Sequence, residues 1–176
     1  MAITRITSPA ITGLTIPNTS INNASLDSVT VLPSGIDTGK VGQVVSVATT
    51  TQRSTTSSSF VAVADMSLAI TPTATSSKIY LTAMQTMGVP PSGGYWSRVS
   101  IFRNGSNLNG NTNGMGSMRT NTGDSIITIP MIYLDSPNST SAQTYQIYFR
   151  SPDSTTIYYN YDSGTTASLV AMEILA

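Results

Sequence analysis

Four aspartates are the residues of this sequence best suited to chemistry, because the chain contains no histidine and no cysteine. Asp124, Asp135, Asp153 and Asp162 could supply the two carboxylates that a glycoside hydrolase uses as acid and base. Each stands beside Gly, Ser or Pro, in TGDS, LDSP, SPDS and YDSG, where aspartate side chains commonly cap turns. The lack of histidine also removes the commonest general base and metal ligand. We therefore expect a protein that is not an enzyme and has no catalytic residue, metal site or cofactor.

A second group of side chains suits binding rather than catalysis. The only tryptophan, Trp96, follows Tyr95 in GGYWSR, and aromatic rings of this kind stack well on sugars. Trp96 could instead be buried in the core or at a subunit interface, as most tryptophans are. The glycine-rich loop from Asn104 to Met118 lacks the Lys-Ser/Thr of a phosphate loop, and long polar loops often bind partners. The receptor-binding candidates are Tyr95, Trp96, Asn104, Asn107, Asn109, Asn111, Tyr158 and Tyr161.

Charge is scarce in this chain, with eight basic and eight acidic residues and a charged fraction of 9%. So few charges create no field that would attract nucleic acid, and we expect a receptor glycan to be neutral or weakly charged. No apolar run approaches the roughly 18 residues of a membrane span, and the N-terminal MAITRITSPA lacks the apolar stretch of a signal peptide. We expect no membrane insertion.

Aliphatic residues recur at every fifth position through the first forty residues. Five residues turn a helix by about 140° net, and an odd spacing alternates between the faces of a strand, so neither element explains the pattern. A chain that runs about three extended residues and then turns a corner would return each aliphatic side chain to one interior. The series comprises Ile6, Ile11, Ile16, Ile21, Leu26, Val31, Ile36 and Val41.

This arm, residues 1–38, should require partners. The NASLD stretch, with Ala24 and Leu26, resembles one unit of the pentapeptide-repeat family, whose members wind a square β-helix. Eight pentads would complete only about two coils of such a helix, and repeat structures need about three or more units to be stable. We therefore expect an extended or β-helical shaft in which three copies of the arm wind around one axis.

From about Gly39 the pattern changes to short alternating segments separated by turn residues. In the last segment Val170, Met172 and Ile174 share one side, which we expect to lie in the core. The pattern over residues 39–176 predicts an all-β fold, an antiparallel β-sandwich that is most simply a jelly roll, with meander and immunoglobulin-like topologies left open. Strands are expected near Gln43–Thr51, Ser59–Val63, Ser67–Thr71, Lys78–Met87, Tyr95–Arg103, Ser125–Leu134, Thr144–Arg150, Thr155–Tyr161 and Ser168–Leu175.

Three stretches carry a wider resemblance: GKVGQVVS, ITPTATSSKIYL and SLVAMEILA. With the repetitive arm, they resemble the C-terminal region of phage virion proteins, fibre or structural proteins of phages of aquatic bacteria, over residues 36 to 176. The resemblance implies a homotrimeric virion surface protein, assembled in the host cytoplasm, whose arm attaches to other virion proteins and whose β-rich knob points outward. Two uses follow from it: a tail fibre that adheres to a host-surface glycan, or a capsid decoration or head-fibre protein attached through the arm.

Overall fold

The structure, a computed structural model, describes residues 41–89, 94–119, 125–161 and 164–175. The chain divides into two units, Met1–Ile36 and Asp37–Ala176, and all described residues belong to the second unit. The expected shaft lies outside the described residues, so its winding and its trimeric state stay predictions. The same is true of its aliphatic residues Ile6, Ile11, Ile16, Ile21, Leu26, Val31 and Ile36.

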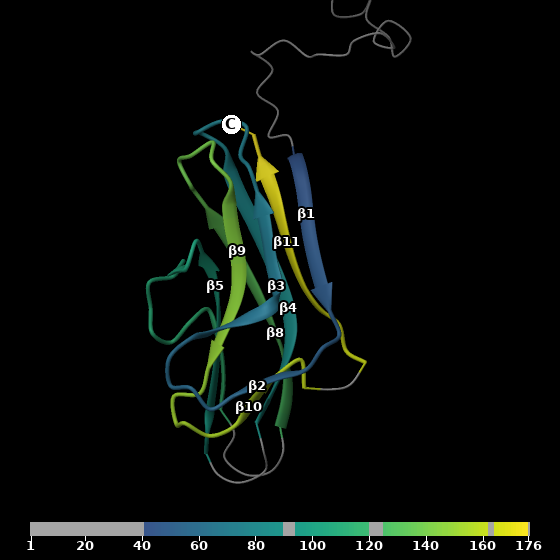
Figure 1. Ribbon diagram of the computed structural model, residues 1–176, viewed down its shortest axis with the longest axis vertical. Coiled ribbons are helices and arrows are strands. Elements are labelled where there is room, and N and C mark those ends of the chain that lie inside the picture. Colours follow the sequence, from purple (N-terminus) through teal and green to yellow (C-terminus); the bar gives the residue numbers. More distant parts are fainter. Residues whose placement is uncertain (1–40, 90–93, 120–124, 162–163, 176) are drawn as a thin grey trace, which may run out of the picture. The chain divides into compact units, whose positions relative to one another are not determined.

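The described part of the second unit consists of strands and contains no helix (Figure 1). Its elements are β1 (Val41–Thr49), β2 (Arg53–Thr55), β3 (Val61–Ile70), β4 (Lys78–Val89), β5 (Trp96–Arg103), β6 (Ser106–Asn107), β7 (Gly116–Arg119), β8 (Ser125–Asp135), β9 (Gln143–Arg150), β10 (Ile157–Tyr159) and β11 (Ala167–Ile174).

These strands form two antiparallel sheets. In sheet A, β11 lies between β1 and β4, and β8 pairs with the other edge of β4 over its whole length. The short strand β10 pairs with the end of β4 and with β2. In sheet B, β9 lies between β3 and β5, and β6 and β7 pair with β5. The sequence prediction of an all-β antiparallel sandwich is confirmed.

The core lies between the inner faces of the two sheets. The alternation in β4 and β9 predicted one apolar side for each strand, and these sides are buried: Ile79 and Leu81 in β4 and Tyr145 and Ile147 in β9 have no exposed surface. Successive side chains of a strand point to opposite faces, so Thr144, Gln146 and Arg150 of β9 point outward. The chemical character of both outer faces is therefore determined by the strand residues whose side chains are not in the core.

Two details of the strands differ from the sequence prediction. The segments expected at Ser59–Val63 and Ser67–Thr71 are one strand, β3, whose register with β9 shifts between Ala62 and Ser67. A bulge of this kind interrupts the alternation of inward and outward side chains, and for that reason the sequence pattern predicted two strands instead of one. The stretch from Asn104 to Met118, expected to be one long polar loop, contains β6 and includes Gly116–Met118 of β7, and its Met118 belongs to the core.

The orientation of β11 is opposite to the prediction. Leu169, Ala171 and Glu173 are fully buried, and the side that carries Met172 points outward. The Glu173 carboxylate accepts hydrogen bonds from Gln43 Nε2 at 2.7 Å and from the Thr73 backbone N–H at 2.6 Å and hydroxyl at 2.8 Å. Hydrogen bonds compensate the burial of a charged group, so the strand can bury its one acidic residue while Val170, Met172 and Ile174 point outward.

Candidate functional site

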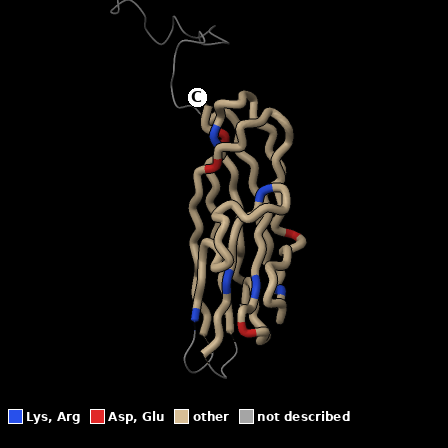
Figure 2. The backbone as a smooth tube through the Cα atoms, turned by 90° about the vertical axis from the view of Figure 1, so that its left-hand side faces the viewer, with Lys and Arg blue, Asp and Glu red and all other residues tan. Residues whose placement is uncertain are grey.

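Cross-strand pairing brings three arginines together on the outer face of sheet B. Arg98 of β5 lies opposite Arg150 of β9, and Trp96 lies opposite Arg119 of β7. Residues directly opposite one another in an antiparallel pair point to the same face, with Cβ atoms about 4.5–5.5 Å apart. In Figure 2, which faces the side that carries β5 and β9, basic positions gather in the lower half of the sandwich. We call Trp96, Arg98, Arg119 and Arg150 the arginine–tryptophan cluster.

Aromatic rings hold the guanidinium groups of this cluster. The Arg98 Cζ lies 4.2 Å from the centroid of the Trp96 ring, and the Arg119 Cζ lies 5.4 Å from the same centroid. The Arg150 Cζ lies 5.4 Å from the Phe60 centroid. These distances are in the range of attractive cation–π contacts. The rings therefore order three cations on one polar surface.

The electrostatic environment of Arg98 is unfavourable for a cation. Burial lowers the pKa of Arg98, the charge of Arg150 lowers it further, and the carboxylate of Asp153 offsets part of the shift. The Nε atoms of Arg98 and Arg150 are enclosed and have no hydrogen-bond partner among the described residues. Asp153 accepts a hydrogen bond from the Trp96 backbone N–H at 2.7 Å, which ties it to the start of β5. Counted over the described residues, the cluster thus has an excess of positive charge.

Trp96 and Tyr95, two of the receptor-binding candidates, point to different places. Trp96 is partly exposed on the outer face of sheet B, so it is not part of the sandwich core. Its ring is contacted by two guanidinium groups, which compete with any sugar for the same surface. Tyr95 is partly buried and packs against the core cluster. Of this pair, Trp96 alone contributes its ring to the outer face.

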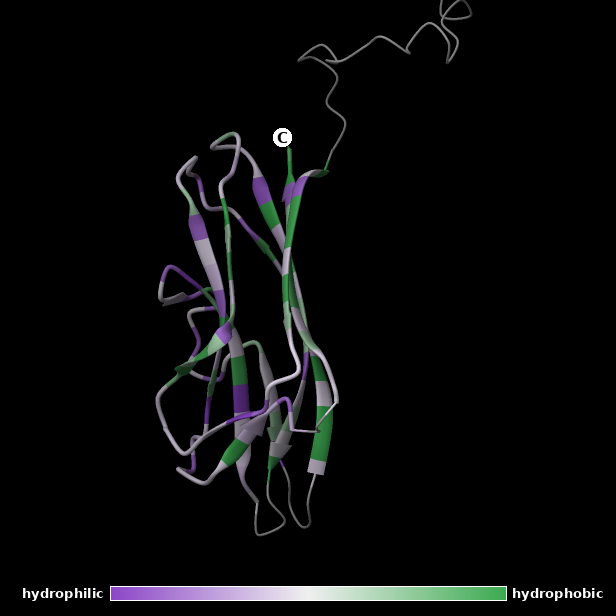
Figure 3. Ribbon diagram, turned by 45° about the vertical axis from the view of Figure 1, so that its right-hand side comes forward, coloured by the Kyte–Doolittle hydropathy of each residue, from purple (hydrophilic) through white to green (hydrophobic). Residues whose placement is uncertain are grey.

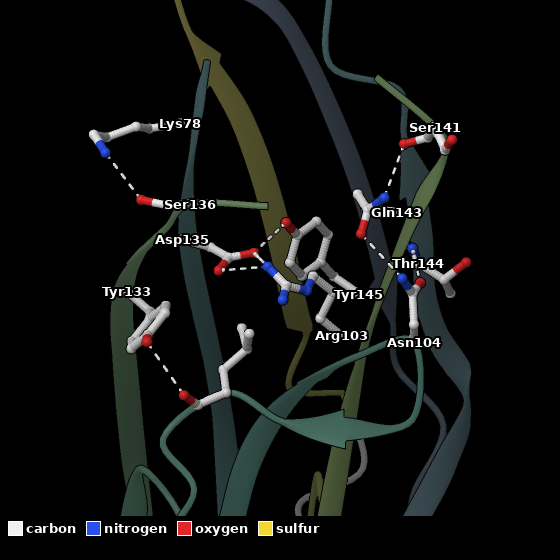
Figure 4. Close-up of polar contacts among 11 residues, drawn as sticks. Lys78, Arg103, Asn104, Tyr133, Asp135, Ser136, Ser141, Gln143, Thr144 and Tyr145 are labelled. Atoms are coloured by element: carbon white, nitrogen blue, oxygen red, sulfur yellow. Dashed lines mark hydrogen bonds and ion pairs between the residues drawn. The ribbon is translucent and has the colours of Figure 1, made fainter. Parts of the chain in front are cut away.

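Three of the four asparagine candidates, Asn107, Asn109 and Asn111, bond within their own loop, and Asn104 bonds to β9. Asn104 has a positive φ of 49° and donates a hydrogen bond to Gln143 Oε1 at 3.0 Å (Figure 4). The Asn107 side chain donates to the carbonyl of Asn111 at 2.8 Å, and the Asn109 side chain accepts from the Asn111 N–H at 3.1 Å. Side chains that satisfy backbone groups in this way build turns. The structure places these residues at one end of β5, separate from the contacts of Trp96.

Tyr158 belongs to sheet A, and Tyr161 lies two residues after the end of β10. Tyr158 lies opposite Gly88 of β4, and the centroids of the Tyr158 and Tyr161 rings are 4.5 Å apart. The Tyr161 ring covers Gly88 so closely that a Cβ atom there would lie 2.2 Å from it. The tyrosines and Trp96 are therefore on opposite outer faces, and the structure does not bring the predicted aromatic candidates together in one site.

Asp135 is an internal ion-pair residue. It is buried at the end of β8, and its carboxylate oxygens accept hydrogen bonds from Arg103 Nη1 at 2.8 and 2.9 Å and from the Tyr145 hydroxyl at 2.6 Å (Figure 4). Burial and this hydrogen bond raise the pKa of Tyr145. Since Asp135 belongs to sheet A and its two partners to sheet B, the contact joins the sheets.

The other three aspartates form no candidate site among the described residues. Asp153 is exposed, and Asp124 and Asp162 lie outside the described residues. Over the described ranges, no group of three or more Asp, Glu, His or Cys side chains could hold a metal ion.

The outer face of sheet A has a different character from that of sheet B. The register places Met84 opposite Pro130 and Thr82 opposite Ile132, and side chains of β11 and β1 continue the same rows. Ile132 is 66% exposed, and four further large apolar residues here are at least half exposed. Figure 3 shows hydrophobic positions in green along these strands. We call this surface the apolar face: Val44, Tyr80, Met84, Ile126, Ile132, Leu134, Val170, Met172 and Ile174.

Charge is nearly absent from the apolar face. Among the described residues of its four strands, the outward positions include one charged side chain, Lys78, which stands at one end and donates a hydrogen bond to Ser136 Oγ at 2.9 Å. Monomeric proteins rarely leave a large contiguous apolar surface in water. The face therefore suits contact with another apolar surface.

Sequence reasoning missed both surfaces. Arg98 is two residues from Trp96, and Arg150 is on the outward side of β9, so their faces were readable. The sequence did not predict that β9 pairs with β5, or that the register places Arg150 opposite Arg98. The apolar face was missed because the outward residues of β11 were assigned to the core.

No protein-family model matches the chain, and no curated protein matches it in sequence. The described residues contain no helix that is both long and apolar enough to cross a membrane. The functional proposal therefore depends on the geometry of the two outer faces and on the sequence resemblance.

Proposed function

We propose that this protein is a non-enzymatic structural protein of a phage virion surface, a short homotrimeric fibre in which the arm attaches to other virion proteins and the sandwich points outward as a knob. The favoured role is that of a tail fibre that adheres to a host-surface glycan. The observation that carries the proposal is the apolar face, which an isolated chain would leave in water.

The apolar face is large enough to form part of a subunit interface. Four strands spaced about 4.8 Å apart, with about seven residues each at about 3.3 Å, cover roughly 450 Å² in projection. Side-chain relief makes the accessible area larger, and a standard interface buries about 800 Å² per partner. Covering each large aliphatic side chain would stabilise the assembly by about 1–2 kcal/mol, because most of them are only half exposed.

The place where the chain enters the sandwich favours a second copy as the covering partner. Strand β1 begins at Val41, immediately after the expected shaft, and Val41 and Val44 are 52% and 57% exposed. Three arms wound on one axis would hold three β1 strands close to that axis. Closed three-fold symmetry would then let the same surface of each sandwich cover a different surface of its neighbour.

The strand order supports a jelly roll as the finer description of the knob. Sheet A contains the series β1, β11, β4 and β8, and sheet B contains β3, β9, β5 and β7. Most successive long strands change sheets, since β1, β4, β8 and β11 alternate with β3, β5 and β9. Two sheets connected in this way are what a double Greek key of eight strands requires.

The alternative role is a capsid decoration or head-fibre protein held by its arm. In this role the arm that precedes β1 would hold the sandwich on the capsid. Cryo-electron microscopy of particles labelled on this subunit would distinguish the roles, because label at the tail supports adhesion and label over the capsid supports decoration.

Light scattering on the full-length protein tests the assembly. The expected mass is three times 18.5 kDa, and a monodisperse monomer would remove the proposal. The paired substitutions Ile132→Asp and Leu134→Asp should dissociate the trimer or weaken it, because they place two carboxylates on the apolar face. Ala62→Asp is the matched control, since Ala62 is exposed on sheet B. A trimer unaffected by the paired change would assign trimerisation to the arm alone.

A further inference from the structure

We propose that the arginine–tryptophan cluster binds an oxyanion, a carboxylate or sulfate group carried by a polysaccharide. The inference deepens the adhesive role proposed above and rests on it for its biological setting. The binding chemistry itself depends only on residues of β5, β7 and β9. It replaces the expectation of a neutral or weakly charged glycan, which came from the small number of charges in the whole chain.

The distribution of charge supports an anionic ligand. The chain has only eight basic residues, yet Arg98, Arg119 and Arg150 occupy neighbouring positions on one face. Like charges directly opposite one another in a sheet repel. Asp153 is the one carboxylate among the described residues that favours the charged form of Arg98. A bound anion would offset the remaining repulsion.

The donors of the cluster are available and partly ordered. Among the described residues, no side-chain hydrogen bond is formed by Arg98 or Arg119, whose guanidinium groups contact the Trp96 ring. Arg150 Nη1 donates to the Ser58 carbonyl at 2.8 Å, which fixes the orientation of that side chain. A planar guanidinium fork fits carboxylate and sulfate oxygens with two parallel hydrogen bonds. Partial desolvation strengthens such a charged contact.

The aromatic residues support the cations instead of binding the sugar directly. Both guanidinium carbons near Trp96 lie within 5.4 Å of its ring centroid, so the indole is already in contact with protein. Cations held over rings lose less conformational freedom when a ligand arrives. The sugar ring is then placed by its acidic group, and not by stacking on Trp96.

Binding to three glucose or uronic-acid polymers tests the inference with the full-length protein at about 0.15 M salt, where weak surface attraction is screened. Dextran sulfate supplies sulfates, polygalacturonate supplies carboxylates, and neutral dextran is the control. We expect binding to one or both acidic polymers and none to dextran. Preference between the two acidic polymers identifies which oxyanion the cluster takes. Equal binding to dextran would overturn the proposal.

Matched variants locate the site. Arg98→Gln and Arg150→Gln should each weaken acidic-polymer binding by about tenfold, as expected for loss of one charged fork. Arg98→Lys should recover only part of this loss, because lysine keeps the charge without the fork. Arg53→Gln is the control, since Arg53 lies elsewhere and pairs with Asp65 at 3.3 Å. An equal loss in Arg53→Gln would show attraction to net charge alone and would overturn the site.

Two further measurements make the outcome decisive. Melting curves of every variant show whether lost binding reflects unfolding. If Arg98→Gln does not fold, Trp96→Phe is the substitute variant, because it keeps an aromatic ring under the guanidinium groups. Duplex DNA that binds more tightly than both acidic polymers would overturn a polysaccharide ligand. Light scattering on the same samples separates the two proposals, because a monomer that binds dextran sulfate contradicts the trimer and not the cluster.

Discussion

The two outer faces of this sandwich are built on similar backbones and carry opposite chemistry. On sheet A, Ile132 and Leu134 are 66% and 53% exposed, and Lys78 is the one charged residue among the described outward positions. On sheet B, Arg98 and Arg150 stand opposite each other beside Trp96. On each face, every second residue of a strand points outward, and the residues between them are buried in the core. The difference shows that core packing leaves outward positions open to selection for other tasks.

Each face is therefore suited to a different neighbour. An apolar surface without charge gains stability when another apolar surface covers it, and it offers little to a soluble polar ligand. Ordered guanidinium groups gain when an anion approaches, and they resist burial against an apolar partner. Assembly on one face and recognition on the other would let a subunit do both at once.

The largest expected effect comes from breaking the contact that joins the two sheets. Asp135→Ala leaves the Arg103 guanidinium and the Tyr145 hydroxyl without their shared partner. We expect a loss of about 2–4 kcal/mol, below the usual range for a broken buried pair because the Arg103 side chain is 30% exposed. Chemical denaturation measures the loss. The control Thr144→Ala removes an exposed side chain on the outward side of β9, and an equal loss in it would show that the effect does not come from the ion pair.

A second prediction tests why the aliphatic side of β11 faces outward. Burial acts to raise the pKa of Glu173, but hydrogen bonds from Gln43 and Thr73 outweigh it and hold the pKa below its usual 4.5. Glu173→Gln should cost about 1–3 kcal/mol near neutral pH, because the amide replaces one buried acceptor oxygen by an NH2 group that faces the donors of Gln43 or Thr73.

The pH dependence of this variant follows from the lowered pKa. A carboxyl group whose folded pKa is depressed contributes stability above its unfolded pKa and loses it as pH falls through the folded value. The melting difference between wild type and Glu173→Gln should therefore shrink below about pH 4.5. The control Met172→Gln, on the outward side of β11, should weaken self-association with little effect on the fold. A difference that is constant down to pH 2 to 3 would contradict the role given to Glu173, since that range is below the usual carboxyl pKa.

A third prediction perturbs sheet A alone. Gly88→Ala would place a Cβ atom 2.2 Å from carbons of the Tyr161 ring, so the ring must move, at a cost of about 1–2 kcal/mol. The control Gly42→Ala should cost less, because its closest contact, at 2.8 Å, is the flexible end of Leu175. Binding of dextran sulfate should be unchanged in both variants. A loss of binding in Gly88→Ala would show that the two faces are coupled.

The smallest effect on the stability of the sandwich is expected from removal of the arm. A chain cut before Gly39 should keep its β spectrum and its cooperative melting, because the core residues from Val63 to Ala171 all lie in the sandwich. Circular dichroism and calorimetry measure this. Attachment to the particle should be lost, and a truncated protein that still decorates virions would show that the arm is not the anchor.

The sequence alone determined the strands and the inner faces where the alternation has one polar side. In β9, Thr144 and Gln146 alternate with Tyr145 and Ile147, and only one orientation buries the apolar set. The same reasoning failed in β11, where Val170 and Met172 alternate with Leu169 and Ala171. Both sides of that strand are apolar, so a period of two does not say which side is inside.

Only the tertiary structure decided which residues of distant strands became neighbours. Arg98 and Arg150 are adjacent because β5 pairs with β9 in one register, and a shift of one residue would send Arg150 to the opposite face. Glu173 is inside because Gln43 and Thr73, from the far end of the chain, reach its carboxylate. These outcomes depend on the energy of contacts between segments. Local sequence fixes the shape of each segment, but not the partner against which its side chains are stable.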